Sequence, residues 1–188
     1  PIPPLTLALI DEYAHARYVD GTIPATFSQN AVSLGGFTGD VYVEIFDDDS
    51  NPALRIDVSQ PAPGKVKLSL PVHLRMSNLS ALAGPQPLSP MGVTARIAIT
   101  ADLVSAPGSI TARFSAATVA VENFAPASGV EGSNYNINKS GASILGIDLE
   151  ALLTGQIASR GQAIVAALGD HVVAVPTVAM IESFIVDQ

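Results

Sequence analysis

Cysteine and tryptophan are both absent from the 188 residues, aromatic residues make up only 5% of them, and charged residues only 14%. Without cysteine the chain cannot form disulfides, thiol nucleophiles, cysteine-ligated zinc sites or iron–sulfur clusters, and it is compatible with either redox compartment. Alanine, valine, isoleucine and leucine therefore supply most of the 48% hydrophobic content. A chain of this length and composition predicts a folded protein with a sizeable aliphatic core.

Basic residues are also scarce, because 9 of them stand against 17 acidic residues and the formal net charge is −8. No segment gathers lysines and arginines into a cluster that could release counterions from a phosphate backbone, so we expect no nucleic-acid partner. Long apolar runs are missing too. Since no window of about 18 consecutive apolar residues exists, we expect no transmembrane segment.

Alternating apolar and polar side chains dominate the middle of the chain. In the clearest run, Lys65–Ser77, every second residue is apolar, which predicts a long strand with one buried and one solvated face. Pro71 in this run has no backbone N–H to donate, which indicates an edge position or a bulge. The apolar members of the run are Val66, Leu68, Leu70, Val72, Leu74 and Met76.

A shorter alternating segment precedes this run. Val41–Phe46 has the pattern of a strand, and the following segment Asp47–Pro52 is poor in strand-forming residues. The pattern predicts a hairpin whose tip is the acidic segment and whose return strand is Ala53–Ser59.

A longer hairpin is expected after the run. Residues 93–103 and 110–121 alternate around the turn Ala106–Ser109. Because the phase of the alternation changes along the second strand, a bulge is expected near Ala116. Antiparallel strands are thus expected over residues 23–124.

Helical spacing of apolar residues occurs in two segments. Residues 1–22 have roughly helical spacing, which favours a short N-terminal helix. Residues 148–168 repeat leucine and isoleucine every three or four positions after Asp148, a suitable N-cap, and this pattern predicts a second, longer helix. Residues 125–147 are rich in glycine, serine and asparagine, so an irregular segment is expected there. Terminal strands are expected over residues 171–187.

These elements predict an α+β protein. No shift in composition marks a domain boundary, so a single domain over residues 1–188 is expected. Its core would be a long, strongly twisted antiparallel sheet packed around one long helix in the C-terminal half. The alternating strands are equally compatible with a β-sandwich that has an added helix, and this alternative stays open.

Motifs for catalysis or metal binding are not found. His15, His73 and His171 are far apart and show no metal-ligand spacing, and no nucleophile elbow or phosphate-binding loop is present. The acidic segment that begins at Asp47 departs from the EF-hand pattern, because Pro52 replaces the required glycine and Val58 stands where the bidentate glutamate belongs. We therefore expect a solvated tip, no metal or cofactor, and no catalytic residues; a hydrolase would need His73 or His171 beside a serine and a carboxylate.

The order of long alternating strands, one long helix and further strands resembles the tubular lipid-binding (TULIP) superfamily, the fold of BPI-like proteins and of the clostridial P47 and OrfX proteins. The segments that carry the resemblance are Lys65–Met76, Val93–Val121, Leu149–Leu168 and Val172–Val186. The resemblance implies a highly curved sheet that wraps a long helix. It also implies an apolar groove for acyl chains between them, although several members of the family act as scaffolds instead.

Two functions follow as expectations. The first is non-catalytic binding of a hydrophobic ligand such as a lipid in a cleft between helix and sheet; the alternative is a structural or assembly module that binds protein partners and has a filled core. Small residues at 95, 101, 112, 163 and 166, all alanine, would leave room for a ligand or would let helix and sheet pack closely. The expected lining is Leu70, Val72, Leu74, Ile97, Ile99, Phe114, Leu153, Ile157 and Ile164.

Overall fold

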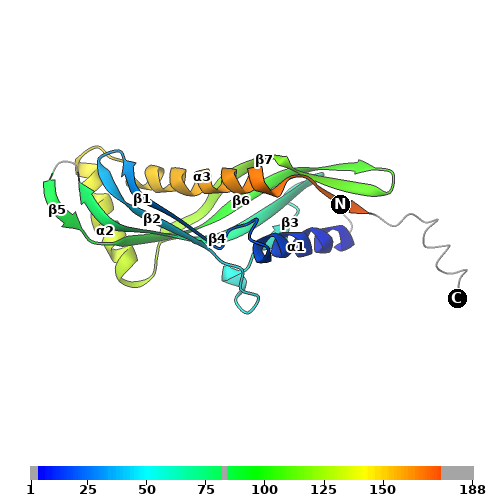
Figure 1. The fold of residues 1–188 in the computed structure, drawn as a ribbon, viewed down its shortest axis with the longest axis horizontal. Helices are drawn as coiled ribbons and strands as arrows, with labels where there is room; N and C mark the ends of the chain where they lie inside the picture. Colours follow the sequence, from blue (N-terminus) through cyan, green and yellow to red (C-terminus); the bar gives the residue numbers. More distant parts are fainter. Residues whose placement is uncertain (1–3, 82–83, 175–188) are drawn as a thin grey trace, which may run out of the picture.

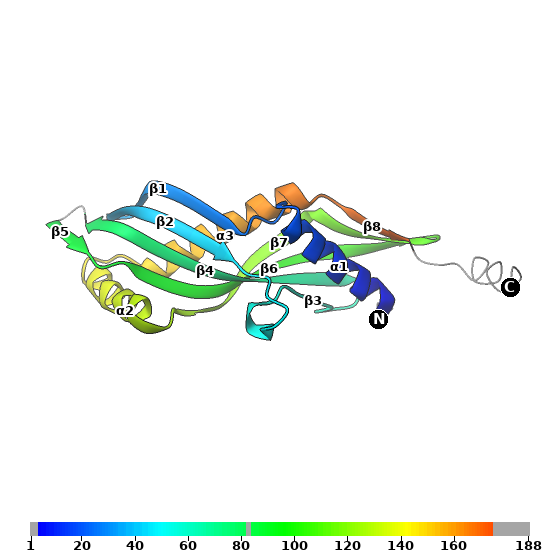
Figure 2. The same cartoon turned by 60° about the horizontal axis from the view of Figure 1, so that its bottom comes forward.

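The structure is a computed structural model that describes residues 4–81 and 84–174. One curled, eight-stranded antiparallel sheet and three α-helices make up these residues, so the predicted α+β class and antiparallel sheet are confirmed (Figures 1 and 2). The strands are β1 (Thr26–Leu34), β2 (Phe37–Ile45), β3 (Asp57–Ser59), β4 (Lys65–Ala81), β5 (Gly84–Leu88), β6 (Met91–Ala106), β7 (Ser109–Pro126) and β8 (His171–Ala174). The helices are α1 (Pro4–Val19), α2 (Gly129–Ile144) and α3 (Leu149–Leu168).

The sheet is organised around β4. Its order is β1-β2-β4-β6-β7-β8, and both β3 and β5 pair with β4 as well. Because β4 and β6 are in register, their apolar faces coincide: Leu70 lies opposite Ile97, and Leu68 lies opposite Ile99. These four side chains are completely buried, and burial of each contributes about 1.5–3 kcal/mol to folding.

Pro71 lies in β4 at a gap between two partner strands; it is not at an edge of the whole sheet and no bulge interrupts its pairing with β6, so the expectation for this residue was wrong. It pairs with Arg96 of β6, and on its other side the partner of β4 changes from β3 to β2. The Pro71 carbonyl accepts a hydrogen bond from the Phe46 N–H at 3.1 Å. A missing donor is tolerated because it falls at the junction between two partner strands.

The predicted hairpin between Val41–Phe46 and Ala53–Ser59 is also wrong. The chain leaves β2, forms a short 3-10 helix over Pro52–Leu54, and returns as β3, which pairs with β4 instead of β2. Alternation cannot reveal this, since two strands that pair with successive parts of the same edge of a third strand have the same pattern as two strands of one hairpin.

The hairpin of β6 and β7 agrees with the prediction. The two strands are joined at Ala106–Ser109, and the register shifts where Thr100 and Asp102 lie opposite Thr118 and Arg113. The irregularity therefore falls over residues 114–117, which confirms the expected bulge near Ala116.

Residues 125–147 are not irregular, because α2 occupies most of them. Its buried residues are Gly132, Tyr135, Asn138 and Ala142, whereas Val130 and Ile137 are 75% and 69% exposed. Tyr135 is the large side chain of this buried face, glycine, asparagine and alanine fill the rest of it, and valine and isoleucine face outward, so the spacing of aliphatic residues in the sequence gives no sign of the helix.

The helices close the curled sheet at different places. α1 packs between β3 and β8, at opposite edges of the sheet, and α2 covers the end near β5 (Figure 2). α3 runs along β7 and β6 (Figure 1). Within the described ranges, none of the helices has the length and apolarity needed to cross a membrane. Of the expected terminal strands, β8 is observed, and residues 175–187 lie outside the described residues.

We expect Gly161→Ala to lower the free energy of unfolding by about 1–2 kcal/mol, although alanine favours helix by about 1 kcal/mol. A Cβ atom at this position would lie 2.5 Å from Val119 Cγ1 and 2.8 Å from Ile97 Cγ2, so α3 would have to move away from the sheet. Gly155→Ala on the same helix is the control, because its Cβ would meet no atom within 4 Å. Urea unfolding followed by circular dichroism should show the control slightly stabilised; equal stabilisation of both variants would contradict the close contact.

Candidate functional site

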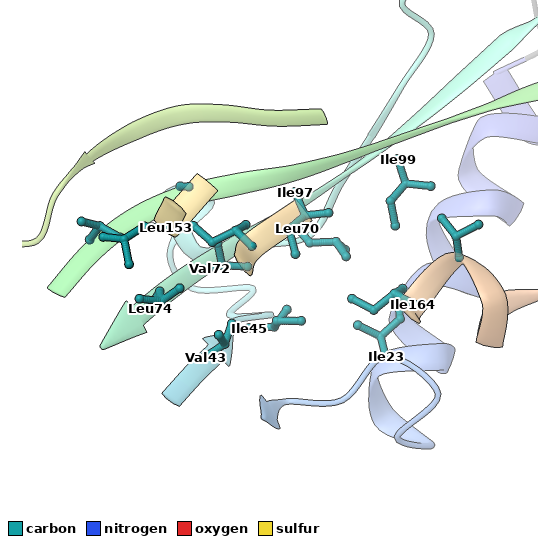
Figure 3. Packing of buried hydrophobic residues seen from close by; sticks show 14 of the residues in the cluster. Ile23, Val43, Ile45, Leu70, Val72, Leu74, Ile97, Ile99, Leu153 and Ile164 are labelled. Atoms are coloured by element: carbon teal, nitrogen blue, oxygen red, sulfur yellow. The ribbon is translucent and has the colours of Figure 1, made fainter. Parts of the chain in front are cut away.

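The nine residues expected to line a groove lie together in the apolar core. None of them is more than 2% exposed, and α3 approaches the sheet so closely that Gly161 touches Val119 and Ile97. Figure 3 shows several of these side chains pointing into the same interior. The nine buried residues are Leu70, Val72, Leu74, Ile97, Ile99, Phe114, Leu153, Ile157 and Ile164.

A groove of about 190 Å³ does adjoin α3, on the side that faces β2. The helix lines it with Arg160, Ala163, Ile164 and Ala167. These residues are at positions i, i+3, i+4 and i+7, which lie on one face of a helix. They form a stripe that extends about 10 Å along the helix axis. Ala163 and Ala167 are exposed, so the groove is open to solvent. We call it the α3/β2 groove.

The opposite wall of the α3/β2 groove comes from the edge of the sheet. Phe27 of β1 pairs with Val43 of β2, and Val43 and Ile45 point to the same side of the strand. The segment after α1 completes the lining with Gly21, Thr22 and Pro24. Of all ten lining residues, only Thr22 and Arg160 carry polar side chains.

Arg160 is the charged group of the α3/β2 groove. Its guanidinium carbon lies 3.2 Å from the centre of the Phe27 ring, and its Nη2 donates a 2.9 Å hydrogen bond to Gln29 Oε1. The Arg160 Nε atom is buried and has no hydrogen-bond acceptor. Burial lowers the pKa of the Arg160 guanidinium from its ordinary value, and the group stays charged at neutral pH.

Ile164 is the one expected lining residue that also lines the α3/β2 groove. Among the small residues that could leave room, Ala163 is in the groove, Ala166 is exposed outside it, and the alanines at 95, 101 and 112 are buried. The missed residues are Arg160 and Ala167 of α3 and the lining residues of β1, β2 and the segment after α1. Alternation does mark Val43 and Ile45 as one face of a strand, but nothing in the sequence places that face beside α3.

A cluster of ionic side chains lies where α1 meets the loop after β2. His15 Nδ1 lies 2.5 Å from Asp47 Oδ2, and Arg55 contacts Asp11 at 3.0 Å and Asp49 at 3.1 Å. His15, Asp47 and Asp49 could each offer one atom to a metal ion, because the three atoms lie within 4.8 Å of one another. The Arg55 guanidinium already supplies a positive charge there, so the cluster is an ion-pair network that attaches α1 to the loop.

The other two histidines have different environments. His73 Nε2 lies 3.2 Å from Glu131 Oε2 of α2, and the His171 ring stacks on Tyr13 at 3.8 Å between centroids. Burial lowers the pKa of both imidazoles. Among the described residues, no hydrogen bond joins either ring to a serine.

Comparisons with known proteins do not identify a relative: no protein family, no curated protein and no solved structure matches the chain. The geometry of the described residues is therefore the basis for any statement about function.

We expect Asp47→Ala to lower the free energy of unfolding by about 1–3 kcal/mol, because a buried backbone donor loses its acceptor. Asp47 accepts a 3.1 Å hydrogen bond from the Ile56 N–H in addition to its contact with His15. Asp49→Ala is the matched control, since the Asp49 side chain is 84% exposed and should contribute little. Urea unfolding measures the free energy of unfolding of both variants. Equal losses would contradict the prediction and would show that the acidic segment is a solvated tip in which Asp47 has no special role.

Proposed function

We propose that the chain binds a hydrophobic ligand, such as the acyl chain of a lipid, in the α3/β2 groove and performs no chemistry on it. The observation that supports this most strongly is the stripe on α3, where alanine occupies two of four positions in front of an apolar wall. Alanine leaves open space beside Val43, Ile45 and Phe27. Each methylene buried there would contribute about 0.8 kcal/mol and would need no directed hydrogen bond.

The dimensions of the α3/β2 groove favour a narrow ligand. Sites for drug-sized molecules usually measure roughly 300–1,000 Å³, and this groove measures about 190 Å³. Since the lining extends about 10 Å along α3, from Arg160 to Ala167, we propose a single acyl chain and not a compact ring system as the ligand. We therefore propose one chain, part of which remains outside the groove.

The proposal includes a fold of the TULIP type. In support of it, α3 lies along a curled antiparallel sheet and packs against β6 and β7 through Gly161. The resemblance implies a ligand between sheet and helix. The ligand would lie beside α3 at its β2 side, because the other side is occupied by Val119 and Ile97.

A structural or assembly module is the second candidate. Two observations favour it: the nine residues expected to line a groove are buried in the core, and Val130, Ile137 and Ile144 of α2 are exposed at intervals of seven residues. A protein of this kind would have no use for the α3/β2 groove, so ligand binding distinguishes the two candidates.

Ala163→Leu and Ala167→Leu should each weaken binding of a fluorescent fatty acid by about tenfold, because the leucine side chain occupies the space of one or two methylenes of the ligand. Ala166→Leu is the control: it makes the same change at an exposed position of the same helix, outside the α3/β2 groove. Fluorescence titration measures the three affinities, and native mass spectrometry of the purified protein shows whether lipid is already bound.

Absence of both uptake and bound lipid in the wild-type protein would contradict the proposal and favour the assembly module. Equal loss of affinity in all three variants would place the ligand elsewhere on α3.

A further inference from the structure

Arg160 differs from most other cations of this acidic protein in having no acidic partner. Arg17, Arg55 and Arg75 each lie within 3.3 Å of a carboxylate oxygen. Lys65, Lys67 and Lys139 also pair with carboxylates. Throughout residues 4–81 and 84–174, no carboxylate forms an ion pair with Arg160, and the lining of the α3/β2 groove contains no acidic residue.

The hydrogen-bonding capacity of Arg160 is mostly unused. Guanidinium donors lie in the plane of the group, so stacking of one face on Phe27 leaves them available. Gln29 accepts one hydrogen bond from Nη2, and the buried Nε has no acceptor. A buried donor without an acceptor is unfavourable, and an anionic oxygen would relieve this cost.

We infer that the ligand of the α3/β2 groove is a single-chain amphiphile with an anionic oxygen headgroup, held by Arg160 while its chain lies along Ala163 and Ala167. The headgroup is a carboxylate or a phosphate monoester, because both present two oxygens to a guanidinium. This inference rests on the proposed function and adds the chemical class of the ligand.

The order of residues along α3 gives the ligand a direction. Arg160 is the first residue of the stripe and Ala167 the last, about 10 Å further along the helix. Phe27 and Gln29 of β1 lie beside Arg160, whereas the backbone N–H of Ile45 donates a hydrogen bond to the carbonyl of Ala25, just before β1. The headgroup would therefore lie beside Phe27 and Gln29 in the first half of β1, and the chain would point toward Ile45.

Isothermal titration calorimetry of the full chain with decanoate, decyl phosphate and 1-decanol tests the inference. The wild-type protein should bind at least one of the two anionic probes about tenfold more tightly than 1-decanol, and the tighter of the two identifies the headgroup. Arg160→Gln should reduce this preference by about tenfold. Arg113→Gln is the control, because it removes the same charge from an exposed position on β7 and should keep the preference.

Each result has a distinct meaning. Equal affinity of the wild-type protein for all three probes would overturn the inference and leave the proposed function intact, whereas no binding of any probe would overturn both. An equal loss of preference in Arg160→Gln and Arg113→Gln would mean that net charge, not a contact with Arg160, selects the anion. If Arg160→Gln does not fold, the ratio of wild-type affinities still decides between an anionic and a neutral ligand, and Arg160→Lys tests the need for the guanidinium.

Discussion

Six apolar side chains lie on one face of β4, and each of them is at most 1% exposed. Because β4 pairs with β2, β3, β5 and β6, its register decides which face of all these strands points into the core. A shift by one residue would turn the apolar face of β4 toward water and the polar face toward the core. Burial of this face therefore determines which face of each neighbouring strand is buried, including the face of β2 that lines the α3/β2 groove.

The position of α3 depends on a contact with that sheet. Gly161 allows the helix backbone to approach Val119 and Ile97, and no side chain fits between them. The helix thus packs tightly on β6 and β7, and its neighbouring face, with Ala163 and Ala167, is too small to fill the space toward β2. The α3/β2 groove follows from this asymmetry: glycine brings the helix close on one side, and alanine leaves room on the other.

Sequence patterns predicted the elements in which one face is apolar and the other polar. β4, the hairpin of β6 and β7 and its bulge belong to this group, because alternation has a period of two and a change of phase marks a bulge. α2 could not be predicted this way, since its buried face carries Gly132 and Asn138 beside Tyr135, and Val130 and Ile137 face outward. The partner of β3 was missed because alternation identifies a strand without identifying its neighbour.

By itself, the sequence determined that the protein is α+β, has an aliphatic core without disulfides, and contains long antiparallel strands with one wet face. These properties are local, because they follow from composition and from the spacing of residues within a segment. Only the tertiary structure decided where the core closes and where it stays open. The expected lining residues are buried in the core, and of them Ile164 alone also borders the α3/β2 groove, which lies where α3, β2 and the segment after α1 meet. Arg160 and Gln29 are 131 residues apart, and their contact depends on the fold of the chain between them, which no local pattern encodes.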